Sequence, residues 1–143
     1  MNKPLVADTG GLIRAIASKP DGSPAWPDHA RELTTASVII IPPLILAEVD
    51  YFLRDQRSAM RRLIADILNP ITRYELEPLI PEDLVRAIEI DRKFAELELG
   101  LVDGSVAAVA ERRAVHRILT IDHKDFSALR IGPKYKQALT LVP

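Results

Sequence analysis

Short apolar runs of strand length alternate along this chain with longer segments in which apolar residues recur at helical spacing. The strands are predicted at residues 4–8, 37–41, 72–79, 116–122 and 138–142. The helices are predicted at residues 10–17, 25–36, 43–55, 57–69, 81–99 and 103–114. Such alternation is typical of an α/β fold, in which helices flank a mainly parallel central sheet.

Proline and glycine mark the boundaries of several predicted elements. The clearest loop spans residues 19–24, which contain two prolines and a glycine. Pro43 and Pro81 suit the first turn of a helix, and Gly100 suits a helix end. The chain has no internal repeat or linker, and its 143 residues can enclose one sizeable core. A single domain over residues 1–143 is therefore expected.

Composition narrows the class of protein. The chain is 48% hydrophobic and 27% charged, which excludes a largely disordered protein. No apolar run approaches the roughly 20 residues that span a bilayer. The first predicted strand also follows the N-terminus without a secretory hydrophobic segment, so a cytoplasmic protein is expected. Cysteine is absent, which excludes disulfides and thiolate metal sites.

Charge adds little at this level. The net charge of −1 neither indicates nor excludes a nucleic-acid partner. Arginines are dense in residues 54–62 and again in residues 112–117, and both groups are interpreted as solvated helix faces rather than as contacts to RNA.

Four carboxylates stand at the ends or centres of apolar segments, namely Asp8, Glu48, Asp103 and Asp122. Asp8 and Asp122 end predicted strands, and sites in parallel sheets form beyond the carboxyl ends of the strands. Asp103 begins a predicted helix, where the macrodipole favours an anion. Converging carboxylates repel one another unless protons or cations neutralise them. The pattern therefore predicts a site for a hard cation.

Glu48 has the most unusual local environment of the four acids. Its neighbours on a helix over residues 43–55 are Leu44, Ile45, Tyr51 and Phe52. No cation lies on that face, so this carboxylate needs a partner from elsewhere in the fold. Asp50, by contrast, is expected to form an ordinary exposed pair with Arg54.

Each of the other three acids also has a purely structural interpretation. Asp8 and Asp103 could each cap the N-terminus of a following helix. Asp122 could start a turn, and Asp125 could replace it or support it. His123 could be a metal ligand, although a histidine in an exposed turn is the favoured interpretation.

In their order along the chain, these segments resemble the PIN-domain ribonucleases, specifically the VapC-type toxins. The matching segments are residues 5–10, 47–49, 101–108 and 120–126. The resemblance implies that Asp8, Glu48, Asp103 and Asp122 bind one or two Mg²⁺ or Mn²⁺ ions. It also implies supporting hydroxyls at Thr9 and Thr120, with Asp125 in a supporting place beside the metal ligands.

The same resemblance implies a metal-dependent phosphodiester hydrolase that cuts single-stranded or loop RNA with an activated water. Arg14 is expected to contact the RNA backbone. The implied partners are a cognate antitoxin, whose inserted segment would approach the acidic cleft, and a second copy of the toxin in a homodimer. The predicted helices at 43–55 and 57–69 could form these interfaces or pack internally.

Other classes of function remain open at this point. PIN domains also serve in RNA processing outside toxin–antitoxin pairs, and the fold could persist as a non-catalytic binding module. Asp8, Thr9 and Gly10 match the active-site tripeptide of aspartic proteases, but those folds are β-rich, whereas residues 81–114 are predicted to be helical. A phosphoacceptor domain would need a lysine after a late strand, and none stands out.

Overall fold

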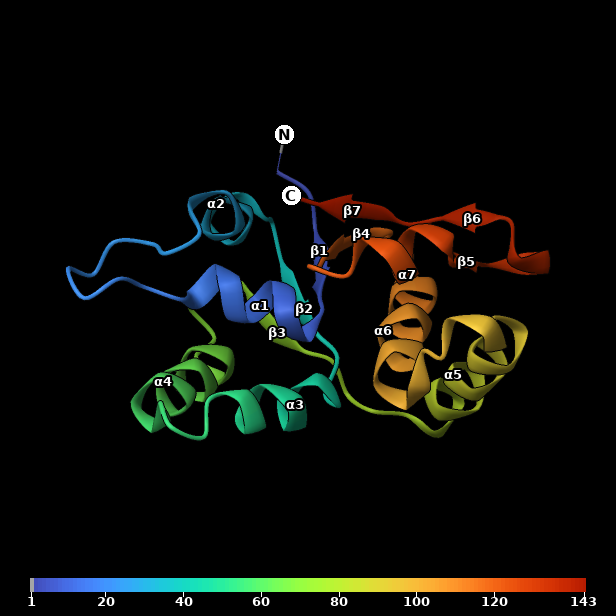
Figure 1. The fold of residues 1–143 in the computed structure, drawn as a ribbon, viewed down its shortest axis with the longest axis horizontal. Coiled ribbons are helices and arrows are strands. Elements are labelled where there is room, and N and C mark those ends of the chain that lie inside the picture. Colours follow the sequence, from blue (N-terminus) through green and yellow to red (C-terminus); the bar gives the residue numbers. More distant parts are fainter. Residues whose placement is uncertain (1) are drawn as a thin grey trace.

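The computed structural model describes residues 2–143, so Met1 of the expected domain lies outside the described part. A five-stranded parallel sheet forms its centre (Figure 1). The strands are β1 (Leu5–Ala7), β2 (Ile39–Ile41), β3 (Tyr74–Leu76), β4 (Arg117–Leu119) and β7 (Thr140–Val142). Their order is β3-β2-β1-β4-β7, and every pairing is parallel. Strands β5 (Arg130–Ile131) and β6 (Gln137–Ala138) form a separate antiparallel pair. The predicted α/β fold is confirmed.

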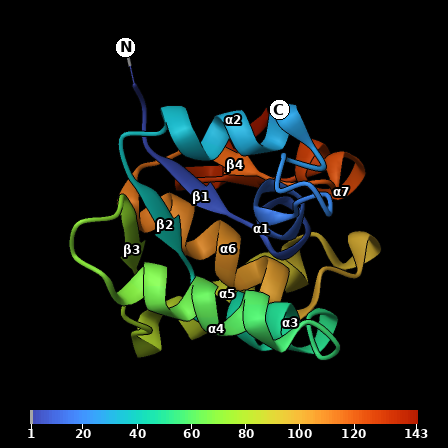
Figure 2. The same ribbon diagram turned by 90° about the vertical axis from the view of Figure 1, so that its left-hand side faces the viewer.

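Helices cover both faces of the sheet (Figures 1 and 2). They are α1 (Thr9–Ile16), α2 (Pro27–Thr35), α3 (Ile45–Phe52), α4 (Arg57–Leu68), α5 (Pro81–Lys93), α6 (Gly100–Arg113) and α7 (His123–Ala128), with short 3₁₀ turns η1 (Ala95–Leu97) and η2 (Pro133–Tyr135). Helices α1, α2 and α4 lie on one face, and α5 and α6 lie on the other. Within residues 2–143, no helix is long and apolar enough to cross a bilayer.

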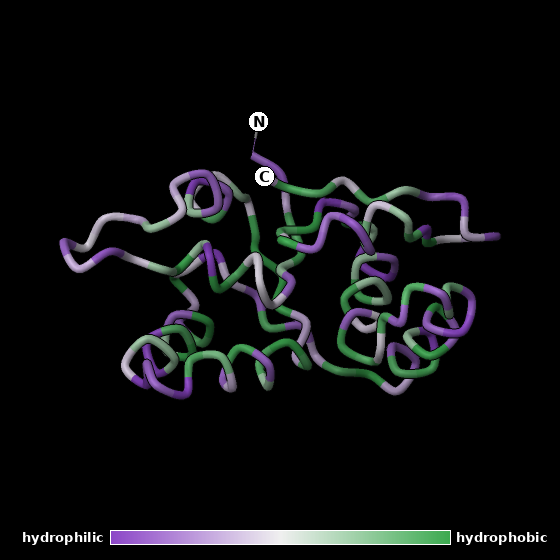
Figure 3. Tube along the Cα trace, in the orientation of Figure 1, coloured by the Kyte–Doolittle hydropathy of each residue, from purple (hydrophilic) through white to green (hydrophobic). Residues whose placement is uncertain are grey.

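Hydrophobic residues follow the central strands, whose side chains form the middle of the core (Figure 3). Strands β1 and β2 are buried at every position, as expected for parallel strands with helices on both faces. Helix α6 is buried from residue 104 to residue 110. Its small side chains allow close packing, because a Cβ atom on Gly104 would lie 2.7 Å from the carbonyl oxygen of Ala87 on α5.

The predicted junction between the helices at 81–99 and 103–114 is wrong. The helix predicted at 81–99 ends at Lys93, because the chain turns through η1 and Glu98 adopts a left-handed conformation with a φ of 52°. Gly100, predicted as a helix end, instead begins α6 with a φ of 76°, three residues before the predicted start. A further helix, α7, follows Asp122 and is capped by it, whereas the structural alternative for Asp122 was the start of a turn.

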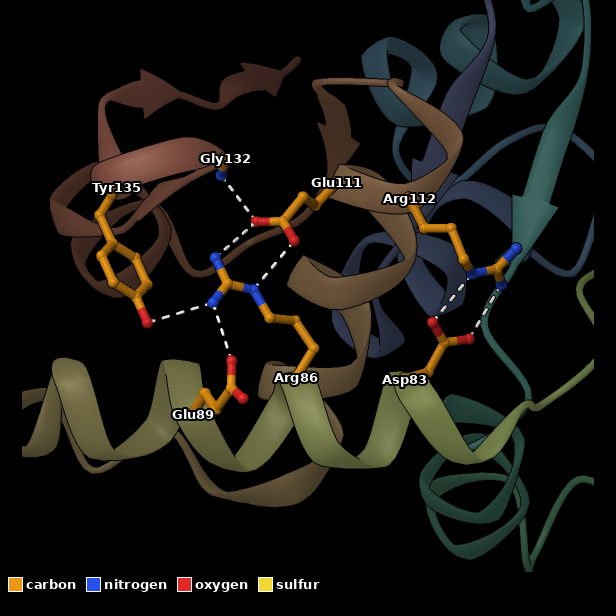
Figure 4. Close-up of polar contacts among 7 residues, drawn as sticks. All are labelled: Asp83, Arg86, Glu89, Glu111, Arg112, Gly132 and Tyr135. Atoms are coloured by element: carbon orange, nitrogen blue, oxygen red, sulfur yellow. Dashed lines mark hydrogen bonds and ion pairs between the residues drawn. The ribbon is translucent and has the colours of Figure 1, made fainter.

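An ionic network fastens α5 to α6 (Figure 4). Arg112 on α6 donates from Nε and Nη2 to the two carboxylate oxygens of Asp83 on α5, both at 2.9 Å. It also lies 2.8 Å from Glu77, which Arg113 contacts as well. Asp83 and Glu77 are buried. The interpretation of arginines 112–117 as a solvated face is therefore wrong, because buried carboxylates occupy two of them and Arg117 pairs with Glu32 at 3.0 Å.

A second part of the network reaches the C-terminal segment. Arg86 on α5 binds Glu111 on α6 through two hydrogen bonds of 2.9 Å. Its Nη1 also donates to Glu89 at 3.0 Å and to the Tyr135 hydroxyl at 3.2 Å. Glu111 accepts in turn from the backbone N–H of Gly132 at 2.6 Å. One arginine thus ties two helices to the turn between β5 and β6 (Figure 4).

Candidate active site

The four predicted carboxylates come from four elements that meet at one edge of the sheet. Strands β1 and β4 are parallel neighbours, so both end at the same edge. Asp8 follows β1 directly, and Asp122 lies three residues beyond β4. Glu48 reaches this edge from α3, and Asp103 reaches it from the first turn of α6.

Asp8 is buried, with 5% of its surface exposed. Its Oδ2 accepts a hydrogen bond of 2.9 Å from the Thr120 hydroxyl. Burial raises the pKa of Asp8, and the charges of Glu48 and Asp122 raise it further, whereas the hydrogen bonds from Thr120 and from the backbone of Thr9 oppose the rise. Asp8 occupies the N-cap position of α1, yet within the described chain its side chain makes no capping hydrogen bond. The capping interpretation of Asp8 is therefore wrong.

The pKa of Asp103 depends on the charges of the other acids in the cluster. Burial raises its pKa to about 7, together with the charges of Asp8, Asp122, Glu48 and Asp125. Asp103 is the fourth residue of α6 rather than its cap, so its side chain is not needed to begin that helix. The carboxylates that the sequence singled out are brought together, and their charges are only partly compensated.

Threonine hydroxyls orient the carboxylates of two of the acids, Glu48 and Asp8. Thr9 donates to Oε1 of Glu48 at 2.6 Å, which joins α1 to α3. The expectation that Glu48 takes a partner from elsewhere in the fold is confirmed. Thr120 donates to Asp8, and its Oγ1 accepts from the backbone N–H of Asp122 at 3.0 Å. These hydroxyls hold the carboxylates without neutralising them.

Asp122 serves the backbone of α7 as well as the acid cluster. Its Oδ1 accepts from the backbone N–H of Asp125 at 3.0 Å, which is a helix N-cap. Burial and the neighbouring Asp122 charge raise the pKa of Asp125. His123 is exposed as the first residue of α7. The structure thus makes Asp122 a helix cap rather than a turn start, and its charge also helps to raise the pKa of Asp103.

The pair expected between Asp50 and Arg54 is wrong. Asp50 binds Arg57 instead, at 2.7 Å. The Arg54 guanidinium lies 4.4 Å above the ring of Tyr51. The chain turns between α3 and α4, which brings Arg57 back to Asp50, whereas sequence spacing considers only neighbours on one continuous helix.

Two glycines after Asp8 allow the close packing of this edge. A Cβ atom on Gly11 would lie 2.2 Å from the carbonyl oxygen of Leu119, at the end of β4. A Cβ atom on Gly10 would lie 2.6 Å from the Ile121 side chain. Ile121 is a site-lining residue that sequence reasoning missed, because only its neighbour Asp122 carried a chemical signal.

The donor set suits a hard divalent cation. Carboxylate oxygens are the ligands that Mg²⁺ and Mn²⁺ prefer, and the cluster contains no sulfur. Among residues 2–143, no three acidic or histidine side chains form a ready-made metal cage. Closer approach of the carboxylates requires a proton or a cation, and the raised pKa of Asp103 reflects that requirement.

Asp103 should make the metal-free protein less stable as the pH rises. Its pKa is about 7 in the folded chain against an ordinary 3.8, so the folded state retains the proton longer than the unfolded state. The stability that this proton provides is present below about pH 4 and is lost as the pH rises to about 7. A shift of this size corresponds to at most about 4 kcal/mol, which solvent screening at this half-buried group reduces to about 1–2 kcal/mol.

Thermal unfolding in EDTA at several pH values measures this effect. Asp103→Asn should unfold at a higher temperature than the wild type at pH 8 and should show a smaller change between pH 5 and pH 8. Parallel pH profiles for the two proteins would contradict the assignment.

The family model for the PIN domain matches residues 5–131, and the chain belongs to this family. It is 29% identical over 135 residues to ribonuclease VapC26 of Mycobacterium tuberculosis, and the match covers 88% of this chain and 92% of the relative. Among solved structures, the fold is similar to that of VapC20 of Mycobacterium tuberculosis, a sarcin–ricin loop cleaving toxin. That match has a TM-score of 0.69 at 18% identity and covers 87% of this chain and 94% of VapC20. The predicted resemblance to VapC-type PIN-domain ribonucleases is confirmed.

Proposed function

We propose that this protein is a Mg²⁺-dependent endoribonuclease and the toxin of a toxin–antitoxin pair. The observation that carries the proposal is the meeting of Asp8, Glu48, Asp103 and Asp122, whose charges help to raise the pKa of Asp103 to about 7. The similarity to ribonuclease VapC26 supports RNA as the substrate. The PIN fold disfavours the aspartic-protease alternative, because its sheet is parallel and flanked by helices.

Asp8 and Asp103 would hold the cation, Mg²⁺ or Mn²⁺, and Glu48 and Asp122 would complete the site. A divalent cation in such a site supplies activation of water for attack on a phosphodiester. Thr120 keeps Asp8 in place, and Thr9 keeps Glu48 in place, so two carboxylates are oriented before the cation binds. Asp125 supports Asp122 through the cap of α7. Arg14 would hold a backbone phosphate of the RNA.

The similarity to VapC proteins also supports an antitoxin partner and a homodimer. On α3, Ile45 and Val49 are buried, whereas Tyr51 and Phe52 are 61% and 60% exposed. Ile45 and Val49 thus pack internally, and the two aromatic side chains at the end of the helix are available to a protein partner. The antitoxin segment would carry a basic side chain that competes for the acid cluster.

Co-purification with a small protein encoded next to this chain tests the pairing. The absence of such a protein would favour a role in RNA processing.

Removal of divalent cations is expected to stop RNA cleavage by the purified protein. EDTA should slow cleavage by at least about a hundredfold, because activation of water depends on the cation. Added Mg²⁺ or Mn²⁺ should restore it and leave 5′-phosphate ends, which sequencing of RNA 5′ ends would map. Undiminished cleavage in EDTA would contradict the metal mechanism. Lack of binding at millimolar Mg²⁺ would instead favour a non-catalytic binding module.

A further inference from the structure

We propose that Trp26 and Arg14 form a base-stacking subsite for single-stranded RNA beside the acid cluster. In this subsite Trp26 is a positioning residue, which holds a nucleobase while the neighbouring phosphodiester lies at the carboxylates. The inference rests on the proposed function and adds to it a specific contact between this chain and its substrate.

Trp26 is an exposed aromatic residue with a cation on its ring. It occupies the N-cap position of α2, and 44% of its surface is exposed. The Arg14 guanidinium lies 4.0 Å from the centroid of the indole ring. The ring of His29 meets the indole edge-on, with a centroid distance of 6.1 Å. The indole is therefore held in place by two neighbours while part of it remains open to a ligand.

The pair formed by Trp26 and Arg14 lies beside the segments that carry the acid cluster. Arg14 lines a pocket of about 380 Å³ together with Gly10, Phe52 and Ile121. Gly10 lies two residues after Asp8, and Ile121 directly precedes Asp122. The pocket therefore shares its wall with the segments that carry two of the four acids.

The neighbour of Trp26, His29, lies within electrostatic range of the start of α7. Burial lowers the pKa of His29, and the charges of Arg14 and His123 lower it further, so the three side chains lie within electrostatic range. His123 directly follows Asp122. Figure 2 shows α1, the start of α2 and α7 on the same side of the molecule.

Arg14 is not among the arginines that form ion pairs. Arg31, Arg57, Arg86, Arg112, Arg113 and Arg117 all form ion pairs. Within residues 2–143, Arg14 has no carboxylate at ion-pair distance, and its guanidinium lies over the Trp26 ring. Its positive charge is thus available to an anionic ligand.

Single-stranded RNA matches this combination of groups. A nucleobase stacks on an aromatic ring or on a guanidinium plane, and the phosphate beside it is attracted to the free charge. An apolar peptide covering the same surface would bury the Arg14 charge without a partner, which is unfavourable. The surface therefore favours single-stranded RNA, in which flat bases alternate with anionic phosphates.

Fluorescence provides a direct test, because Trp26 is the only tryptophan in the chain. The wild-type protein is titrated in EDTA, where binding is observed without cleavage, with a short single-stranded RNA. A matched oligonucleotide of equal charge but without bases serves as the control. We expect the RNA to quench the tryptophan fluorescence and the abasic strand to leave it nearly unchanged.

Variants at this position separate stacking from simple packing. Trp26→Leu, which keeps an apolar side chain, should bind labelled RNA roughly tenfold more weakly, as expected for loss of one base stack. With Mg²⁺ it should raise KM and leave kcat nearly unchanged, whereas Trp26→Phe should restore most of the binding. Ile71→Ala, a change at a 90% exposed residue outside the proposed subsite, should behave like the wild type.

The outcomes distinguish this inference from the proposed function. If RNA binds without quenching, or the abasic strand quenches equally, the stacking subsite is refuted even when Mg²⁺-dependent cleavage is observed. If RNA quenches the fluorescence and no cleavage occurs with Mg²⁺, the subsite stands and the nuclease proposal fails. If the co-purified protein partner quenches the fluorescence and RNA does not, the occupant is a protein and the inference is overturned.

Discussion

Asp103→Asn is expected to abolish metal-dependent RNA cleavage, with a loss of at least about a thousandfold, and to leave the chain folded. The charges of the other acids in the cluster all raise the pKa of Asp103, so this carboxylate lies close to each of them. Asparagine keeps the shape of the side chain and removes the charge that would bind the cation. Since Asp103 does not cap α6, the helix loses no N-terminal hydrogen bond.

Asp8→Asn should have the same effect on cleavage. The amide oxygen of asparagine can still accept the hydrogen bond from Thr120, so the end of β1 keeps its link to β4. Asp21→Asn, a change in the exposed loop before α2, is the control and should cleave RNA like the wild type. Cleavage by both Asp8→Asn and Asp103→Asn at the wild-type rate would contradict the proposed site.

Arg112→Leu is expected to cause the largest loss of stability. It leaves Asp83 without its two hydrogen bonds from Arg112 and weakens the partnering of Glu77, and both carboxylates are buried. Removing one partner of a buried pair costs about 3 kcal/mol or more, because the remaining charge stays desolvated. For a chain of this size, such a loss lowers the thermal midpoint by about 10 °C.

Thermal or urea unfolding measures this loss. The matched control is Arg31→Leu, which breaks the exposed pair with Asp28 on α2. An exposed pair contributes about 0–1 kcal/mol, so the control should unfold close to the wild type. Equally small effects of the two changes would show that the ionic network between α5 and α6 stabilises the fold no more than an exposed ion pair does.

Helices and strands could be predicted from the sequence where the local pattern of apolar and polar residues determines them. The apolar run at 37–41 contains β2, and the five predicted strands all appear, although each is shorter than predicted. The boundary near Lys93 could not be foreseen, because Glu98 adopts a left-handed conformation that its side chain does not favour. After that reversal α6 packs against α5, where Gly104 lies close to Ala87, and contacts between residues this far apart in sequence are not visible in the local pattern.

The acid cluster was likewise predictable only in part from the sequence. Asp8, Glu48, Asp103 and Asp122 were identifiable because each is a charge in an apolar context, and the family resemblance supplied their order. The hydrogen bond from Thr9 to Glu48 joins residues 39 positions apart, and the one from Thr120 to Asp8 joins residues 112 apart. The local sequence pattern does not indicate the roles of Thr9 and Thr120, which only the family resemblance implied.

Periodicity and composition alone determine that this chain forms an α/β fold and carries four acids in unusual places, because both are properties of neighbouring residues. Tertiary structure decides which charges remain available. It pairs Arg112, Arg113 and Arg117 with carboxylates and leaves Arg14 on the ring of Trp26. Charge pairing depends on which elements meet in space, and a linear sequence does not record those distances.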